Sequence, residues 1–523
     1  MSGAPDHPLS RGLPLYDSVR HSAKLYPGRP ALIDGERVVT YATLWERSRR
    51  LAKLLVGGLG LAPGSRFGVL TRNRPEIAEM YVGAAISGCA CVPLNYRLAG
   101  AEMAVLLLDA EARALIADPG LEEQVQGLLA AGYDGSIVRL GDEYESLLGR
   151  CSADASSSAA AGGRNVSEIV LQMYTSGTTG VSKGVMLSHR NLVANSWTNL
   201  AERNVVEGDT YLVTTPLCQI GGVSRMLTTF QASSTLRMLA KFDPEQVLQL
   251  IDSEAVTTAF FVPTMIQMLL DAAPGARVIG PRFRRLCYGG SPIPRSLLEE
   301  AMARMPCEFQ QGYGLTESSP NLTTLRPEDH VLDGPESVVR RLGSVGRESV
   351  GVNVRVVDQE GHDVRPGEQG EIVASGANIM EGYWHRPEAT AAAIRDGWLH
   401  TGDLGTVDDE QYLFITDRKS DMLISGGINV YPREIELLLE RQPAVAEVAV
   451  VGRPDRRWGE VPVAFIVLRP GVDEARARAE LEVVCRQRLA GYKTPKDYVF
   501  VSALPRNAMG KVLKRHLRTG DPS

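Results

Sequence analysis

The stretch Tyr174–Gly184 reads YTSGTTGVSKG and follows the apolar run Ile169–Met173, which predicts that a β-strand leads into it. Its three glycines allow close backbone approach to a ligand, and free backbone N–H groups can form an anion nest. The hydroxyls of Thr175, Ser176, Thr178 and Thr179 add donors, and the ammonium of Lys183 adds a positive charge. We therefore predict a loop that binds polyphosphate through Thr175, Ser176, Gly177, Thr178, Thr179, Gly180 and Lys183.

Two other loop patterns were compared with this stretch. A Walker A loop needs Gly before the Lys and Ser or Thr after it, whereas Ser182 precedes Lys183 and Gly184 follows it. Gly180–Gly184 (GVSKG) does match the GxSxG pattern of α/β-hydrolases, in which Ser182 would be the nucleophile. A hydrolase that needs no ATP therefore stays open as an alternative from another class of enzyme.

On the N-terminal side of the loop, apolar segments of two kinds alternate. The pattern predicts strands over Arg66–Leu70, Cys89–Pro93 and Ala114–Ala117, and helices over Pro75–Ile86 and Glu102–Asp109. Strands that alternate with helices favour βαβ units and a parallel sheet. The polar, low-complexity stretch 152–164 is expected to be a surface loop.

The character of the chain changes again near Asp417. Short strands with turns between them are predicted before it, over Val350–Val357 and Glu371–Ala374. Beyond it, the sequence predicts an α/β pattern whose elements are Pro432–Glu440, Val445–Val451, Val463–Leu468 and Arg476–Arg488. We therefore expect a large N-terminal domain over 1–417 and a small α/β domain over 418–523.

Composition excludes several classes of protein. With 523 residues, 44% of them hydrophobic, the chain can bury more than one core. A net charge of −6 argues against a protein coated by nucleic acid. No signal peptide is recognised, and the longest apolar stretch, Tyr81–Leu94, is too short to span a bilayer. The seven cysteines are scattered, so we expect neither a disulfide framework nor structural zinc, and a cytoplasmic location.

Five further motifs follow the loop in the chain: GGS at 289–291, QGYGLTE at 311–317, WLHTGD at 398–403, DRKSDMLISGGINVYPREIE at 417–436 and PRNAMGK at 505–511. In this order they resemble the signatures of the adenylate-forming superfamily, which includes acyl-CoA synthetases, peptide-synthetase adenylation domains and beetle luciferases. The resemblance implies an α/β fold. Its large N-terminal domain holds stacked α/β subdomains and a β-rich subdomain, and its small C-terminal α/β domain is mobile.

The resemblance also implies a reaction in two steps. A carboxylate attacks the α-phosphate of ATP, giving an acyl-adenylate and pyrophosphate, and a thiol, usually that of CoA, then displaces AMP. Because the first step brings an anion against a triphosphate, electrostatic clamping is its main need. By their matching positions, Lys511 would bridge the two reactants, Thr316 would contact phosphate, and Glu317 would bind Mg²⁺. The expected cofactors are ATP, Mg²⁺ and CoA.

The remaining nucleotide contacts are assigned by the same resemblance. Tyr313 would stack on adenine, and the carboxylate of Asp403, with Arg418, would hold the ribose hydroxyls. Further contacts to the nucleotide are expected near adenine, from the GGS motif and the QGYGLTE motif: Gly289, Gly290, Ser291, Gln311, Gly312 and Gly314.

The second step would require the C-terminal domain to rotate, because one site serves two unlike reactions. Ser420 lies at the matching hinge position, where the family usually has Asp or Lys, so a charge-based latch is in doubt. Gly426 and Gly427 would let the backbone approach the pantetheine arm of CoA. Trp458 and Lys493 are two further candidates for holding CoA.

The segment Pro216–Gly222 (PLCQIGG) bears on the acid substrate. Many acyl-CoA synthetases have an aromatic residue and a His where Cys218 and Gln219 stand, so a role that needs His protonation is excluded. No acidic residue lies between Leu212 and Leu236, which disfavours an amino acid substrate. An apolar fatty or aromatic acid is expected, in a pocket lined by Trp197, Gln219, Gly221 and Phe261. Alternatively, Arg225 would recognise a second carboxylate.

The leading hypothesis is therefore an ATP-dependent acyl-CoA synthetase that acts on a small-molecule carboxylic acid. An acyl-AMP ligase that loads a carrier-protein phosphopantetheine is the alternative within the family, and a nucleotide-binding relic without activity is another. We expect no nucleic-acid partner and no transmembrane segment, and a homodimer stays open.

Overall fold

The structure, a computed structural model, describes residues 12–152, 165–175, 182–253, 255–275, 278, 280–418, 421–425, 428–456, 458–506 and 512–519. The chain divides into two compact units. Unit 1 comprises Met1–Val354 and Ala374–Leu399, and unit 2 comprises Arg355–Val373 and His400–Ser523. The predicted stretch 152–164 lies, apart from its first residue, outside the described residues. The predicted boundary at 417/418 stays a prediction.

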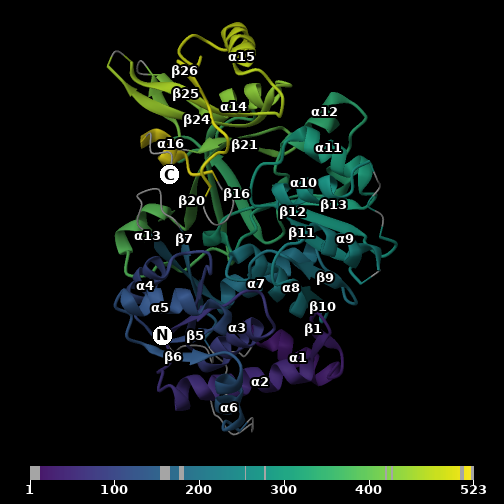
Figure 1. Cartoon of the computed structure of the whole chain (residues 1–523), viewed down its shortest axis with the longest axis vertical. Coiled ribbons are helices and arrows are strands. Elements are labelled where there is room, and N and C mark those ends of the chain that lie inside the picture. The colour runs from purple at the N-terminus through teal and green to yellow at the C-terminus, as the bar shows by residue number, and fades with distance from the viewer. Residues whose placement is uncertain are drawn as a thin grey trace, which may run out of the picture. The chain divides into compact units, whose positions relative to one another are not determined.

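A nine-stranded sheet forms much of unit 1 (Figure 1). Its central strands pair in parallel, and antiparallel strands close both of its ends. The strand order is β15 (Arg347–Glu348), β14 (Thr323–Leu325), β13 (Glu308–Tyr313), β12 (Arg285–Gly289), β11 (Thr258–Phe261), β9 (Thr210–Val213), β10 (Thr235–Met238), β1 (Pro30–Asp34) and β2 (Arg37–Thr40).

A seven-stranded sheet is the second sheet of unit 1. Five of its strands pair in parallel, while β8 and β18 pair antiparallel at one edge. The order is β18 (Gly382–Tyr383), β8 (Lys183–Ser188), β7 (Ile169–Thr175), β4 (Ala90–Leu94), β3 (Arg66–Leu70), β5 (Ala112–Ala117) and β6 (Ser136–Arg139).

Thirteen helices connect these strands: α1 (Asp17–Leu25), α2 (Tyr41–Lys53), α3 (Glu76–Ser87), α4 (Gly100–Asp109), α5 (Glu122–Ala130), α6 (Asp142–Gly149), α7 (His189–Ala201), α8 (Ile220–Gln231), α9 (Pro244–Asp252), α10 (Pro263–Ala272), α11 (Arg295–Arg304), α12 (Glu336–Val339) and α13 (Pro387–Ala393), counted among the residues described. Helices α7 and α8 lie side by side (Figure 1). Because α8 contacts β9 and β10 while α7 contacts β8, this pair links the two sheets.

Helix α3 is buried along its whole length, which explains why the sequence is apolar there. Its two acidic residues are paired rather than solvated. Glu79 accepts hydrogen bonds from Arg47 at 2.6 Å and from the hydroxyl of Tyr144 at 2.9 Å. Pro75 stands before its first turn, and Gly88, with φ of 78°, ends it in the left-handed conformation that glycine tolerates.

Unit 2 is built on two smaller sheets. One is shared with unit 1 and contains β16 (Val352–Val357), β17 (Gly370–Gly376), β20 (Trp398–Val407) and β19 (Ile394–Arg395), with β21 (Leu413–Arg418) paired to β20. The division between the units falls within β16, β17 and β20, and β19 belongs to unit 1. The other contains β23 (Ile428–Val430), β22 (Leu423–Ser425), β25 (Gly459–Leu468) and β24 (Val445–Asp455), with β26 (Asp497–Phe500) paired to β25. Its helices are α14 (Pro432–Glu440), α15 (Glu474–Arg488) and α16 (Lys514–Thr519).

The predicted mixed α/β class is confirmed, and the predicted elements agree with the observed ones to within a few residues at their ends. The parallel pairing expected for the N-terminal strands is also found. Among the described helices, none is long and apolar enough to cross a membrane. The stretch Tyr81–Leu94 instead contributes part of the buried helix α3 and the strand β4.

Candidate active site

The two ends of the phosphate-loop motif lie on β7 and β8, which pair antiparallel. Thr175, the last residue of β7, is the register partner of Lys183, the first residue of β8. The hydroxyl of Tyr174 donates to Asp109 at 2.7 Å and fixes the end of β7. The predicted contacts Ser176, Gly177, Thr178, Thr179 and Gly180 lie outside the described residues.

A tyrosine brings the two charged residues of the predicted site together. Lys183 Nζ lies 5.0 Å from the centre of the Tyr383 ring, and the Tyr383 hydroxyl donates to Glu317 Oε1 at 3.0 Å. Tyr383 is held there because β18 pairs with β8, opposite Val185. Burial, and the charge of Glu317, raise the pKa of Tyr383, so its hydroxyl stays a donor. Two motifs far apart in sequence thus meet at one point.

Thr316 and Glu317 belong to a short 3₁₀ helix, η4 (Thr316–Ser318), that follows β13. Both are half-buried, and the backbone oxygen of Glu317 accepts from Met380 N at 2.9 Å. This arrangement fits a magnesium ion that enters with ATP, because Mg²⁺ takes only one or two protein carboxylates besides phosphate and water. No larger cluster of metal-binding side chains is found in the part of the chain that the structure describes.

The glycines on the predicted adenine side lie where β12 and β13 end. Gly289 and Gly312 are register partners in parallel strands, and a Cβ on Gly289 would lie only 2.3 Å from the Gly312 oxygen. Gly290 has a φ of 80°, which favours glycine, and Ser291 follows as an exposed residue. Carboxyl ends of parallel strands are where α/β sheets bind ligands. Of the neighbouring residues, Tyr313 is largely buried.

The predicted acyl pocket is only partly brought together. Gln219 precedes the first residue of α8 and is half-buried, and Gly221 lies in the first turn with open space around it. Trp197 on α7 is 50% exposed. Phe261 is fully buried and packs edge-on against Phe242 in the core, so its ring serves packing. The adjacent ring, that of Phe260, instead lies 5.1 Å from the guanidinium carbon of Arg225.

Unit 2 carries the predicted ribose contacts. Asp403 on β20 is 3% exposed, and Arg418 on β21 is its register partner. The sheet therefore places the two residues at adjacent positions. Of the two CoA candidates, Trp458 is 41% exposed, while Lys493 donates to both oxygens of Glu434, at 2.7 and 2.9 Å. The residues Ser420, Gly426, Gly427 and Lys511 lie outside the described residues.

Sequence reasoning missed Tyr383, which lies between Lys183 and Glu317. No motif considered there includes it, and its strand is only two residues long. The sequence identified Arg225 as a candidate for binding a second carboxylate, but it did not show that this side chain is buried or which residues surround it. The hydrophobic alternation in Thr258–Phe261 was also too short to show which of two adjacent phenylalanines faces the core.

Parallel strands that end in glycines, together with a lysine and a carboxylate that contact the same tyrosine, are typical of a nucleotide-binding α/β fold. The chain belongs to the AMP-binding enzyme family. The family model matches residues 19–384, and the model of the AMP-binding enzyme C-terminal domain matches residues 434–511. The predicted adenylate-forming family and ligase class are confirmed.

Among its relatives, the chain is 38% identical over 503 residues to feruloyl-CoA synthase from Amycolatopsis sp, covering 95% of this chain and 96% of the relative. It is 37% identical over 512 residues to the fatty acid–[acyl-carrier-protein] ligase ScoC from Streptomyces coeruleorubidus, covering 96% of each. The solved o-succinylbenzoate coenzyme A synthetase (MenE) from Bacillus subtilis, in complex with ATP and magnesium ion, superposes with a TM-score of 0.82 at 31% identity. That match covers 97% of this chain and 99% of MenE.

Proposed function

We propose that this chain is an AMP-forming acyl-CoA synthetase. It adenylates a carboxylic acid, fatty or aromatic, with release of pyrophosphate, and then transfers the acyl group to CoA with release of AMP. ATP, Mg²⁺ and CoA are its cofactors. The observation that carries the proposal is the meeting of Lys183 and Glu317 at Tyr383, in a chain that matches the family along most of its length.

In the first step, Lys183 would attract the phosphates of ATP, and the carboxylate of Glu317 would hold the magnesium ion that accompanies them. When bound, Mg²⁺ offsets the charge of the triphosphate. Thr316 contacts the α-phosphate, Tyr313 stacks on adenine, and Asp403 holds the ribose. Lys511 bridges the two reactants as charge develops. These roles rest on the motif matches and on the positions of the described residues.

Between the two steps, we propose that a C-terminal domain over 418–523 rotates about Ser420. The glycines Gly426 and Gly427, with Trp458, then admit the pantetheine arm. The measurable consequence is that Lys511→Ala should abolish adenylation yet leave thioester formation from pre-made acyl-adenylate largely intact. Equal loss of both half-reactions would contradict the role of Lys511.

A second candidate is a ligase that loads a carrier protein, and one relative, ScoC, bears that name. The two candidates differ in the second step only. Purified protein is given Mg·ATP and a panel of acids, with and without CoA, and the product is read by mass. Acyl-CoA that forms only when CoA is present supports the synthetase, whereas adenylate that accumulates and survives the addition of CoA supports the carrier-loading ligase.

Location and partners follow the same proposal. None of the described cysteines forms a disulfide, which is typical of a reducing compartment; they are Cys89, Cys91, Cys151, Cys218, Cys287, Cys307 and Cys485. We propose a cytoplasmic enzyme whose partners are a small acid and CoA. Size-exclusion chromatography with light scattering would decide between a monomer and a homodimer.

A further inference from the structure

The guanidinium of Arg225 is an unusual charge for the interior of unit 1. It projects from α8 and is 5% exposed. Its Nη1 donates to Asn199 Oδ1 at 2.9 Å, and its carbon lies over the ring of Phe260. Among the residues that the structure describes, the buried Nε has no hydrogen-bond partner, and no acidic side chain forms an ion pair with this guanidinium.

A charge in this position is costly unless an anion accompanies it. A buried ion without a partner loses its hydration, and arginine cannot avoid this cost by deprotonation, because it stays protonated in proteins. Two other arginines of unit 1, the buried Arg285 and the half-buried Arg284, are paired with carboxylates. Arg285 donates to Glu308, and Arg284 donates to Asp209. Arg225 differs from them because its amide partner and aromatic neighbour carry no negative charge.

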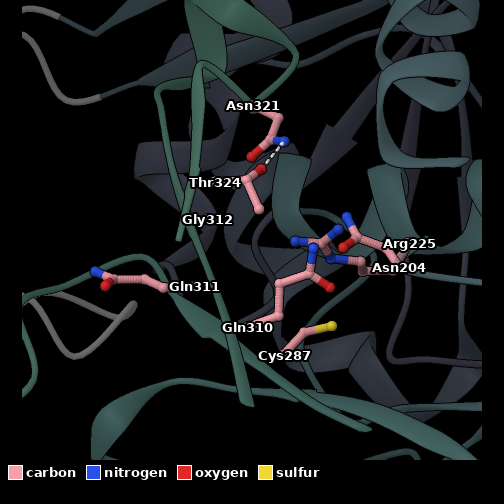
Figure 2. A pocket seen from close by; sticks show the side chains of 8 residues that line it. All are labelled: Asn204, Arg225, Cys287, Gln310, Gln311, Gly312, Asn321 and Thr324. Carbon is pink, nitrogen blue, oxygen red and sulfur yellow. Dashed lines mark hydrogen bonds between the residues drawn. The ribbon is translucent and has the colours of Figure 1, made fainter. Parts of the chain in front are cut away.

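The group faces a small polar cavity (Figure 2). The lining residues are Asn204, Arg225, Cys287, Gln310, Gln311, Gly312, Asn321 and Thr324. Arg225 is the only charged one among them, because burial raises the pKa of Cys287 and keeps its thiol neutral. Gln310, Asn204 and Arg225 point toward one another, whereas Gln311 points away. The cavity is thus positive and rich in neutral hydrogen-bonding groups.

Gly312 lies between Arg225 and Asn321 and places no side chain there. A Cβ there would lie 2.9 Å from Asn321 Oδ1 and 3.7 Å from Arg225 Nη2. As its side chains stand, the cavity has no room for a water molecule, so one end group of a ligand can enter only when lining side chains move apart, and a whole substrate does not fit. Nε and Nη2 together form the edge of guanidinium that binds a carboxylate with two parallel hydrogen bonds.

The cavity adjoins the predicted reaction site. Gly312 precedes Tyr313 directly, and Thr316 follows four residues further on. A chain of that length spans at most about 14 Å. An acid whose reacting carboxylate lies near Thr316 can therefore extend its other end to Arg225.

We propose that Arg225 is a specificity-determining residue that binds a second carboxylate, so that the substrate of this enzyme is a dicarboxylic acid. The inference rests on the proposed synthetase activity and names the substrate class of that same site. It also explains why the interior tolerates this guanidinium, since the substrate supplies the missing anion.

The test compares matched acids. Wild-type protein is assayed for acyl-CoA formation with straight-chain dicarboxylic acids of about four to eight carbons, which fit the span above, and with monocarboxylic acids of equal length. The same panel is run with Arg225→Met, which keeps the volume and removes the charge, and with Arg225→Lys, which keeps the charge and removes the fork. Thermal unfolding of each variant is recorded without substrate.

We expect wild type to prefer the dicarboxylic acids. Arg225→Met should lower the ratio of kcat/KM for diacid over monoacid by about 30-fold or more, because a buried charge pair is lost. The ratio for Arg225→Lys should lie between those of wild type and Arg225→Met. Arg225→Met should not lower the Tm of the substrate-free protein, whereas the control Arg284→Met should lower it by leaving the buried Asp209 without its cation.

Three outcomes would overturn the inference. One is that wild type shows no preference for diacids and that Arg225→Met leaves the ratio of kcat/KM for diacid over monoacid unchanged. Another is equal loss of both acid types in that variant, which would place Arg225 at the reacting carboxylate. The last is the absence of turnover with every acid of this panel while another fatty or aromatic acid is activated. The proposed synthetase function itself fails only if no acid of either panel is turned over.

Discussion

Tyr383→Phe is the sharpest test of the proposed magnesium and phosphate site. The substitution removes one hydroxyl, which donates to Glu317 Oε1 at 3.0 Å. It keeps the ring, and therefore the contact of that ring with Lys183. Because burial and Glu317 raise the pKa of Tyr383, the lost hydroxyl is a protonated donor over the whole working pH range.

The size of the effect follows from that one bond. A hydrogen bond to a charged group contributes about 1.5 to 3 kcal/mol, which corresponds to a factor of about 10 to 150. If Glu317 binds the magnesium ion of Mg·ATP, a carboxylate that has lost its orienting partner should weaken that binding. Outer partners of metal ligands usually change affinity or activity by about 10- to 100-fold. We therefore expect a rise of at least tenfold in the Mg²⁺ concentration that gives half-maximal activity.

The assay is pyrophosphate release at fixed ATP while Mg²⁺ is titrated. Wild type, Tyr383→Phe, Glu317→Gln and the double variant form a cycle, and the two losses should not add, because the hydroxyl acts through the carboxylate. Tyr144→Phe is the matched control. It removes a hydroxyl that donates to another buried carboxylate, Glu79 at 2.9 Å, and should lower stability without changing the Mg²⁺ dependence. Additive losses, or an unchanged Mg²⁺ titration in Tyr383→Phe, would refute the reasoning.

Three further predictions concern stability and nucleotide binding. Gly289→Ala places a Cβ 2.3 Å from the Gly312 oxygen, so the binding of ATP, followed by calorimetry, should weaken strongly. Arg47→Met leaves the buried Glu79 without its cation and should destabilise the protein by about 3 to 5 kcal/mol in urea unfolding. Burial lowers the pKa of His330 from 6.5 to about 4. Only the unfolded chain then gains a proton as the pH falls from 7 to 5, and stability should drop by about 2 kcal/mol more than in His330→Gln.

Much of the fold could be predicted because many helices and strands have start and end signals in their own local sequence. The helix at Pro75–Ile86 has a proline at its start and a glycine after its end, and the observed helix is Glu76–Ser87. Partners in the sheets could not be predicted in the same way. Leu32 pairs with Leu236, and nothing in either strand identifies the other. Register depends on packing between segments far apart, which one sequence does not reveal.

The candidate site shows the same division. The motifs identified Lys183 and Glu317 separately, because each type of residue has a chemical reason to be there. That Tyr383 joins them depends on the pairing of a two-residue strand with β8, which has no sequence signal. The motif matches also could not show that the Arg225 guanidinium would face neutral side chains, since these come from separate strands and loops.

The hairpin that carries the phosphate loop has a consequence for the conditions under which the enzyme works. Strand β8 begins at Lys183, and the next helix, α7, starts only at His189. Loops that lead directly into a helix gain the partial positive charge of the helix N-terminus, which salt screens poorly when it is buried. Here the attraction for nucleotide depends more on side-chain cations such as Lys183, whose reach shrinks as the Debye length shortens. Activity should therefore decline with ionic strength, which would make the salt content of the cell a factor in its rate.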